Sequence, residues 1–537
     1  MIDIEDSRTW VLPQMLAVRA ASHADKRFVQ IVDGDALTFA EAAHDADKVA
    51  GHLLALGVSP GDKVAVFVRN SLDFVRAWTG LGRLAAVCVL LNTELKGAFL
   101  AHQLENCGAA VAIVGADLLP VLADIAPRLS ALRTVLVAED EAVPGEAPSG
   151  WNLLPFSGWR RAATYDGPMP QAHDIAAIMY TSGTTGPAKG VLMPQAHCFL
   201  FGFGAVDCLK VSEADTYYIV LPLFHANGLF MQLYACLIAG ATAVVRRRFS
   251  AAGWLNDVQR YGATITNALG VVSAFVVDTP PRPDDRDHKL RLVLAAPNPA
   301  EHVPVWRERF GIAAVSSGFG MTEVNIVAWG SAEGTLPGSA GKPYDRFFEV
   351  SIRDPQTDAE LAIGDVGEIM VRPRLASGFM AGYHAMPDKT VEAWRNLWFH
   401  TGDAGRIDTD GYLHYVDRIK DCIRRRGENI SSFEVEQVIA QVPGVAEVAA
   451  FAVPATLSGG EDEVMLAVIA RPGARLTPED IARHADPELP RFALPRYIEI
   501  VDALPKTPTE KVRKAELRRR GIGPATWDRE LAKSRSA

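Results

Sequence analysis

A loop rich in glycine and hydroxyl residues, set between two apolar segments, most limits the folds open to this 537-residue chain. The loop is Thr181–Gly190, TSGTTGPAKG, and it joins the apolar segments Ile175–Tyr180 and Val191–Met193. A buried strand that feeds such a loop lets glycine amides approach a polyphosphate closely, and Lys189 adds a positive charge. The hydroxyl donors are Ser182, Thr184 and Thr185. A flexible surface loop is the alternative, but it leaves the lysine unexplained.

The spacing of this loop differs from that of a Walker loop. Lys189 follows Ala188 and precedes Gly190, whereas a Walker lysine follows glycine and precedes serine or threonine. The sequence therefore predicts a phosphate loop of another kind.

Length and charge narrow the class of protein. A chain of 537 residues is too long for one hydrophobic core and predicts several structural units. Apolar residues make up 49% and charged residues 22%, which is typical of a globular enzyme. The net charge of −10 argues against nucleic acid and anionic membranes as partners.

Cysteine usage and apolar runs bear on location. The six cysteines form no C-x-x-C pair, which predicts reduced thiols. The acidic start MIDIEDSRTW has no apolar signal region, and apolar runs such as Leu84–Leu91 are too short to span a membrane. We therefore expect a cytoplasmic protein without integral membrane association.

Local patterns predict an α/β protein. A helix is expected over Asp47–Gly57, and strands over Lys63–Val68 and Ala110–Val114, an alternation typical of parallel βαβ units. The middle third repeats this pattern with strands at Tyr217–Leu221, Thr242–Arg246 and Leu292–Ala295. The segment Gly364–Pro373 predicts a small β-barrel or sheet, and the chain beyond Asp417 predicts an α+β domain of about a hundred residues.

Four further clusters carry chemically useful groups. The first, LPLFHANG, places His225 just after a strand, although a lone histidine is more often structural. The second, GFGMTE, ends in Glu323, and the third, WFHTGD, ends in Asp403, a carboxylate suited to two vicinal ribose hydroxyls. The fourth, LPKTPTEK, exposes Lys511 on a loop shaped by prolines.

In this order and spacing, the five clusters resemble the adenylate-forming superfamily that includes acyl-CoA synthetases and firefly luciferase. The resemblance covers roughly residues 20 to 520, and RRRGENISSFEVE is similar to the acyl-CoA ligases, including the carnitine and crotonobetaine ligases. It implies a large N-terminal domain, 1–419, with two parallel-sheet αβα subdomains and a small β-barrel-like subdomain. A small mobile α+β domain, 420–537, would follow. The implied activity is an AMP-forming acyl-CoA ligase that uses ATP, Mg²⁺ and coenzyme A on a small carboxylic acid, with a homodimer left open.

The resemblance also implies site residues. The implied catalytic residues are Lys511, Glu323, Thr184 and His225, with Glu323 as the Mg²⁺ ligand. The implied ATP and CoA contacts are Thr181, Ser182, Gly183, Thr185, Gly186, Lys189, Phe319, Gly320, Met321, Thr322, Asp403, Arg418, Lys420 and Gly427. In this assignment Phe319 stacks on adenine, Thr322 contacts the α-phosphate, and Asp403 binds the ribose with Arg418. Lys420 is the hinge, and Gly427 lines the pantetheine tunnel.

One position departs from the family pattern. Where the family's last loop has T-G-K, this chain has Glu510 between Thr509 and Lys511. If that residue has φ > 0, a glutamate there costs about 1 kcal/mol. Its carboxylate would also favour the charged form of Lys511.

The acid itself stays open, as do rival functions. Family position marks an apolar, small pocket set: Met231, Leu269, Gly270, Val271, Ser317 and Gly318, with Phe319 and Trp329 as further walls. An amino-acid adenylation module would carry aspartate where this chain has His225. A luciferase-like oxygenase, delivery to another acceptor and a regulatory nucleotide-binding protein are the remaining alternatives.

Overall fold

The chain folds into two compact units. The computed structural model describes residues 6–139, 150–181, 187–269, 271–296, 298, 302–418, 422–425, 428–455, 461–506 and 512–536. Unit 1 comprises Met1–Thr93, Leu104–Tyr180 and Gly190–Asp417. Unit 2 comprises Glu94–Gln103, Thr181–Lys189 and Arg418–Ala537. None of the helices in the described ranges is long and apolar enough to cross a membrane.

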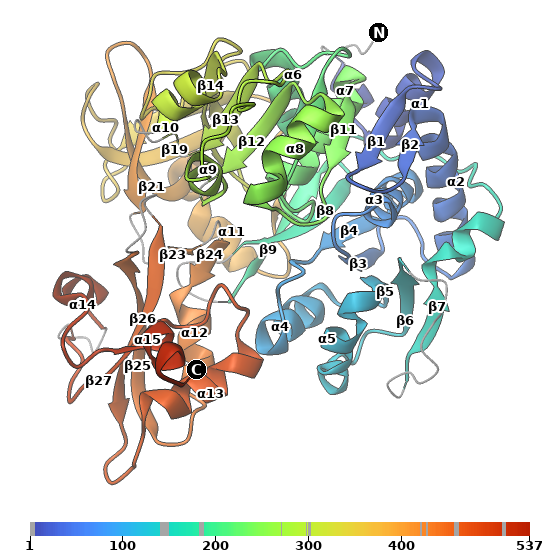
Figure 1. The fold of residues 1–537 in the computed structure, drawn as a ribbon. Helices are drawn as coiled ribbons and strands as arrows, with labels where there is room; N and C mark the ends of the chain where they lie inside the picture. The colour runs from blue at the N-terminus through green and yellow to red at the C-terminus, as the bar shows by residue number, and fades with distance from the viewer. Residues whose placement is uncertain are drawn as a thin grey trace. The chain divides into compact units, whose positions relative to one another are not determined.

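An eight-stranded sheet contains most of the N-terminal strands (Figure 1). Its order is β20-β9-β8-β4-β3-β5-β6-β7, with bounds β3 Lys63–Phe67, β4 Val87–Leu90, β5 Val111–Gly115, β6 Thr134–Ala138, β7 Asn152–Pro155, β8 Ile175–Thr181, β9 Lys189–Pro194 and β20 Gly382–Tyr383. The strands β8, β4, β3, β5, β6 and β7 pair in parallel, and β20 pairs antiparallel with β9. The predicted strands Lys63–Val68 and Ala110–Val114 correspond to β3 and β5.

A seven-stranded, mostly parallel sheet is the second large sheet of unit 1. Its order is β14-β13-β12-β10-β11-β1-β2, with bounds β1 Arg27–Ile31, β2 Ala36–Thr38, β10 Thr216–Ile219, β11 Thr242–Val245, β12 Ile265–Leu269, β13 Leu292–Ala296 and β14 Ala314–Ser316. Only the β1–β2 pair is antiparallel among the pairings in these described strands. This arrangement confirms two parallel αβα subdomains.

Helices alternate with these strands between residues 7 and 397. Their bounds are η1 Ser7–Thr9, α1 Leu12–Ser22, α2 Phe39–Ala55, α3 Leu72–Leu84, α4 Gly97–Cys107, η2 Ala116–Leu118, α5 Leu119–Ala123, η3 Ala126–Arg128, η4 Phe156–Arg161, α6 Gln195–Cys208, η5 Asn227–Tyr234, α7 Ala235–Ala239, α8 Ala251–Tyr261, α9 Val271–Val277, α10 His302–Pro304, η6 Val305–Arg309, α11 Pro387–Ala393 and η7 Arg395–Leu397. The helix predicted over Asp47–Gly57 starts eight residues earlier, because Thr38 and Glu41 form a capping box there. It ends as predicted beside Gly57, whose φ is +86°.

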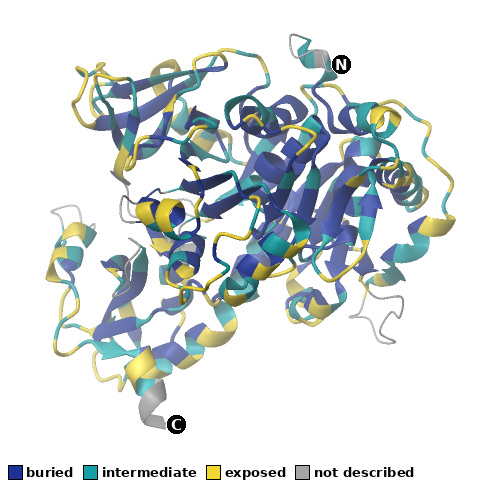
Figure 2. Cartoon of the chain, turned by 45° about the horizontal axis from the view of Figure 1, so that its top comes forward, coloured by how far each residue is buried: buried dark blue, intermediate teal, exposed yellow. Residues whose placement is uncertain are grey.

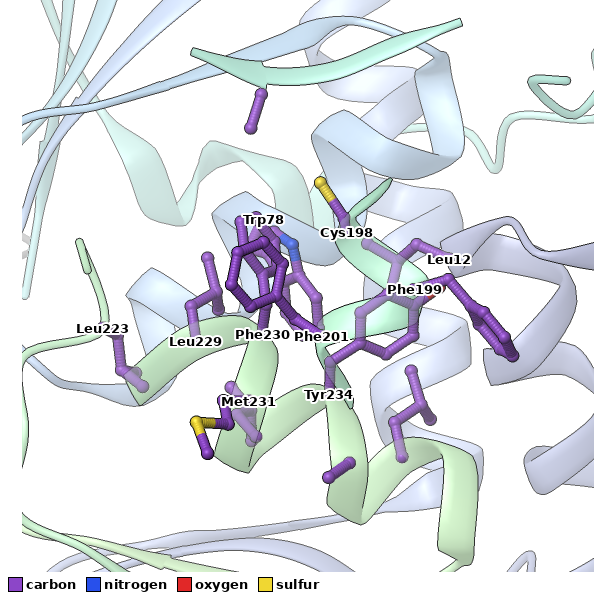
Figure 3. Packing of buried hydrophobic residues seen from close by; sticks show 14 of the residues in the cluster. Leu12, Trp78, Cys198, Phe199, Phe201, Leu223, Leu229, Phe230, Met231 and Tyr234 are labelled. Carbon is purple, nitrogen blue, oxygen red and sulfur yellow. The ribbon is translucent and has the colours of Figure 1, made fainter. Parts of the chain in front are cut away.

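The core of unit 1 follows from strand alternation. Tyr217 and Ile219 of β10 belong to one buried cluster. Tyr218 of β10 and Val220, just after the strand, belong to a second cluster on the opposite face. Both faces of the sheet are therefore covered, as a parallel sheet requires, and the buried layers run through the interior in Figure 2. Figure 3 shows the larger cluster where α6 and the π-helix η5 meet, with Phe230 and Tyr234 packed near Trp78.

Antiparallel sheets complete unit 1. A three-stranded sheet has the order β15-β16-β17, with bounds β15 Gly318–Met321, β16 Asn325–Trp329 and β17 Lys342–Pro343. A four-stranded sheet has the order β18-β19-β21-β22, with bounds β18 Phe348–Arg353, β19 Gly367–Pro373, β21 Phe399–Ile407 and β22 Leu413–Arg418. The predicted β-rich segment Gly364–Pro373 contains β19, in agreement with a small barrel-like subdomain.

Unit 2 has its own sheet and helices. Its strands are β23 Cys422–Arg425, β24 Glu428–Ser431, β25 Val445–Pro454, β26 Asp462–Ala470, β27 Tyr497–Ile500 and β28 Trp527–Asp528; its helices are α12 Ser432–Ile439, α13 Pro478–Glu488, α14 Lys514–Arg520 and α15 Arg529–Ser536. The sheet order β25-β26-β27-β28 mixes parallel and antiparallel pairs. The predicted α+β fold of this region is confirmed.

Candidate active site

The turn between β15 and β16 holds a buried carboxylate. Glu323 is only 3% exposed, and the Tyr383 hydroxyl donates to its Oε1 at 3.1 Å. The backbone carbonyl of Glu323 accepts from the N–H of Met380 at 3.1 Å. Side chain and backbone of Glu323 are thus both held by the segment around β20. A carboxylate oxygen is the kind of hard ligand that Mg²⁺ prefers.

A buried histidine contacts the backbone of the same turn. His197, on α6, is 0% exposed, and its Nε2 lies 2.9 Å from the carbonyl oxygen of Thr322. Its Nδ1 lies 3.2 Å from the carbonyl oxygen of Gly378 and 3.3 Å from Asn325 Nδ2. Burial lowers the pKa of His197 to about 4, and the two carbonyls oppose this effect. The imidazole is therefore neutral, and the Nε2–H tautomer donates to Thr322.

The strand before this turn carries the predicted adenine contact. The Phe319 ring is buried and lies stacked near Tyr415, with ring centroids 6.2 Å apart. At Gly320 an added Cβ would stand 2.2 Å from the carbonyl oxygen of Asn325, so the close β15–β16 approach admits only glycine. Close strand packing alone accounts for this glycine.

A bulge in β21 presents the predicted ribose contact. Glu368 faces Ala404 and Met370 faces His400, so the single residue between them on β19 faces the three residues 401–403 of β21. Asp403, in this bulge, is 3% exposed. Gly402 has φ +73°, a conformation that glycine adopts without strain.

Glu368 stabilises the bulge through hydrogen bonds. Its Oε1 accepts from the Gly402 N–H at 2.9 Å, and its Oε2 lies 3.0 Å from His400 Nδ1. The Thr401 hydroxyl donates to the carbonyl of Ile369 at 2.6 Å and accepts from the Asp403 N–H at 3.1 Å. The Asp403 backbone is thus positioned by two fixed side chains.

The predicted acyl-side residues come from several elements, and Met231 lies in η5. His225 is partly exposed, and its ring centroid lies 4.6 Å from that of Phe224. Met231 and Ser317 are buried, whereas Leu269 and Gly318 are partly exposed. Gly270 and the Val271 side chain lie outside the described residues. An added Cβ on Gly204 would stand 2.7 Å from the Trp329 ring, so the indole packs against α6 in the core.

The phosphate loop begins and ends on strands. Within unit 2, β8 ends at Thr181 and β9 begins at Lys189, and both residues are half-buried. The N–H of Ala188 donates to Glu434 Oε1 on α12 at 2.8 Å, and burial raises the pKa of Glu434 to about 7. Ser182, Gly183, Thr184, Thr185 and Gly186 lie outside the described residues, as do Lys420, Gly427, Glu510 and Lys511. Arg418 ends β22, and its side chain is not described.

Within the described ranges, no group of three or more His, Cys, Asp and Glu residues could hold a metal ion. Glu323 is the one metal ligand that the family resemblance implies among the described residues. Such a donor set fits Mg²⁺, which binds through one or two carboxylates, substrate phosphates and water.

Two family models match the chain. The AMP-binding enzyme model matches residues 16–384, and the AMP-binding enzyme C-terminal domain model matches residues 434–511. The chain belongs to the AMP-binding enzyme family. Lys511 is the last residue of the second match, and Asp403 lies between the two matches.

Several similar proteins are CoA ligases. A sulfoacetate–CoA ligase from Cupriavidus necator is 31% identical over 94% of this chain and 97% of its own length. A crotonobetaine/carnitine–CoA ligase from Shigella dysenteriae is 28% identical over 90% of this chain and 93% of its own length. The o-succinylbenzoate CoA synthetase structure from Bacillus subtilis has a TM-score of 0.79 at 26% identity and covers 94% of this chain and 98% of its own. The predicted enzyme class, an AMP-forming acid–thiol ligase with ATP and CoA as substrates, is confirmed.

Sequence reasoning missed three residues of unit 1 that position predicted site residues: His197, Glu368 and Tyr383. Glu368 had a recognisable signal, because it is a charged residue inside the apolar strand sequence GEIMV. The other two act over long sequence separations, and no local pattern marks them.

Proposed function

We propose that this enzyme joins a carboxylic acid to coenzyme A in two half-reactions on the residues described above. In the first, a carboxylate oxygen attacks the α-phosphorus of ATP, the bond to pyrophosphate breaks, and an acyl-adenylate forms. In the second, the CoA sulfur attacks the acyl carbon, the bond to AMP breaks, and the thiol proton leaves. The observation that carries the proposal is the buried Glu323 carboxylate, held by Tyr383 and next to Thr322.

The nucleotide would be bound by separate parts of the chain. Loop Thr181–Gly190 would hold the β- and γ-phosphates, with Thr184 and Lys189 as main contacts. Phe319 would stack on adenine, and the nearby Tyr415 ring extends the same aromatic surface. Asp403 would bind both ribose hydroxyls, assisted by Arg418. The remaining loop and strand contacts in this proposal are Thr181, Ser182, Gly183, Thr185, Gly186, Gly320, Met321 and Thr322.

Charge neutralisation is the main catalytic need, because both substrates are anionic. Mg²⁺ bound to Glu323 would reduce the negative charge of the phosphates. Lys511 would bridge the substrate carboxylate and the α-phosphate, where charge develops in the transition state. His225 would stand close to the acid's carboxylate, at the mouth of the CoA tunnel.

Two domains would serve the two half-reactions. We place the large domain at residues 1–419 and the mobile domain at 420–537, with Lys420 as the hinge and Gly427 lining the pantetheine tunnel. Rotation about Lys420 would remove Lys511 after adenylation and bring Gly427 to the acyl group. We further propose a cytoplasmic location, where ATP and CoA are available. A homodimer stays a prediction.

The acid is proposed to have a neutral acyl group. The described pocket candidates, Met231, Leu269, Ser317 and Gly318, carry no charge. The names of the relatives cover acids of different charge, so they do not select one. A short or medium aliphatic acid, an aryl acid or a carnitine-like betaine fits such a pocket. A dicarboxylic acid that outperforms every monoacid in kcat/KM would contradict the neutral pocket.

The experiment measures pyrophosphate release with ATP, Mg²⁺ and a panel of acids, with and without CoA. We expect acid-dependent AMP and pyrophosphate, and an acyl-CoA thioester only when CoA is present. Acid-dependent ATP cleavage with no thioester for any acid would contradict CoA as the acceptor. No acid-dependent AMP at all would contradict the enzyme assignment of these residues.

A further inference from the structure

A hydrogen-bonded network of amide side chains lies at the start of the π-helix η5. The Tyr217 hydroxyl donates to Asn267 Oδ1 at 2.7 Å, and Asn267 Nδ2 donates to Asn227 Oδ1 at 2.8 Å. Gln232 Nε2 donates to the same Asn227 oxygen at 2.8 Å. Tyr217, Gln232 and Asn267 are each 0% exposed, whereas Asn227 is partly exposed. The cluster therefore has a single accessible member.

The hydrogen-bond network determines which of its neighbours the oxygen of the Asn227 amide contacts. A separation of 2.7 Å is typical of a hydroxyl donating to an oxygen, so Asn267 turns its oxygen toward Tyr217. Burial keeps the pKa of Tyr217 well above its usual range, and the hydroxyl remains a donor. Asn267 must then turn its NH₂ group toward Asn227, which in turn must offer its oxygen.

The second polar group of the Asn227 side chain is thus a donor. Its oxygen accepts two amide hydrogens, which leaves its NH₂ group to donate to another acceptor. Its Nδ2 lies 3.2 Å from the sulfur of Met231, which is buried and also lies 3.9 Å from Asn267 Nδ2. A thioether is a weak acceptor. An amide N–H in this position gains from a stronger acceptor supplied by a ligand.

The position of Asn227 connects it with the acyl-side residues. It lies two residues after His225 and contacts Met231, both of which belong to the proposed acid site. Asn267 lies on β12, two residues before Leu269, a third candidate. π-helical segments such as η5 occur frequently at functional sites.

We propose that Asn227 is a specificity-determining residue that donates a hydrogen bond to an acceptor oxygen on the chain of the acid substrate. The substrate class is then a small, uncharged acyl group that bears a carbonyl, ether or hydroxyl oxygen. The inference rests on the proposed function, because it concerns the acid site of that reaction.

The test compares acids that differ only in an acceptor oxygen. Methoxyacetate is matched with butyrate, and levulinate with isocaproate, because ether and ketone oxygens accept but cannot donate. Wild-type enzyme is expected to prefer the oxygen-bearing acid of at least one pair by about tenfold or more in kcat/KM. Asn227→Asp keeps the oxygen that accepts from Asn267 and Gln232 and replaces the NH₂ group by a second oxygen, so it should abolish or reverse that preference.

Two further variants make the test independent of folding. Asn256→Asp makes the same chemical change at an exposed position, where Oδ1 accepts from Arg282, and should keep the wild-type preference. Tyr217→Phe leaves Asn227 intact but releases the Asn267 amide to turn, so the preference should fall by about threefold or more. If Asn227→Asp does not fold, the result with Tyr217→Phe decides whether the inference holds.

The outcomes separate this inference from the proposed function. A wild-type preference below about twofold in both pairs, or one retained in Asn227→Asp, overturns the role of Asn227 while the ligase reaction stands. If no acid drives formation of AMP, the proposed function itself fails. A preference that Asn227→Asp removes and Asn256→Asp retains supports the inference.

Discussion

His197 makes the stability of unit 1 depend on pH. The imidazole is fully buried between the carbonyls of Thr322 and Gly378, and burial lowers its pKa to about 4. In the unfolded chain the pKa returns to about 6.5. As the pH falls, the unfolded chain therefore binds this proton first. The stabilising contribution is complete above about pH 6.5 and is lost as the pH falls toward 4.

The magnitude follows from these two pKa values. Between pH 7 and pH 5, a pKa of about 4 in the folded state and 6.5 in the unfolded state removes about 2 kcal/mol from the free energy of unfolding. His197→Gln keeps an N–H that can donate to Thr322 but has no proton to gain. The variant should therefore lose about 2 kcal/mol less than wild type over the same range.

Urea unfolding followed by tryptophan fluorescence measures this difference, because nine of the ten tryptophans lie before residue 418. Both proteins are unfolded at pH 7 and pH 5, so the other histidines cancel in the comparison. Equal pH dependence in His197→Gln and wild type would refute a neutral, buried His197. A lower stability of the variant at pH 7 alone would not bear on the argument, since packing also changes.

Three further predictions concern the reaction. Tyr383→Phe removes the hydroxyl that donates to Glu323 and should raise the Mg²⁺ concentration for half-maximal activity by about 10–100-fold; Glu323→Ala should lower Mg²⁺-dependent activity more, and an unchanged Mg²⁺ titration in both would exclude this site. Lys511→Ala should slow adenylation by about 10²–10⁴-fold, while thioester formation from supplied acyl-AMP persists; equal loss of both half-reactions would argue against domain alternation. Lys420→Pro fixes φ near −65° and should block CoA transfer but spare adenylation, as single-turnover measurements of each step would show; an unimpaired overall rate would mean that Lys420 is not the pivot.

Regular elements of this fold could be predicted where local pattern and tertiary environment agree. Apolar runs such as Lys63–Val68 became β3 because both faces of a parallel sheet are buried. The start of α2 was misplaced because the prediction followed apolar spacing and overlooked the capping pair Thr38 and Glu41.

The surroundings of the site could not be predicted from local sequence. Glu323 meets Tyr383 across sixty positions, and His197 reaches Thr322 across 125 positions. The bulge at Asp403 depends on register with β19, which no single strand encodes. Cluster residues such as Glu323 were identifiable because their spacing resembles a known family, whereas the residues that hold them were not.

The central claim is that the acid's own oxygen attacks the α-phosphorus of ATP. A preferred acid labelled with oxygen-18 in its carboxylate, incubated with ATP, Mg²⁺ and CoA, tests it directly, because thiolysis of acyl-AMP breaks the bond between the acyl carbon and that oxygen. Mass spectrometry should find one labelled oxygen in AMP and none in pyrophosphate. Label in inorganic phosphate, with ADP as the nucleotide product, would show attack at the γ-phosphorus and contradict the account.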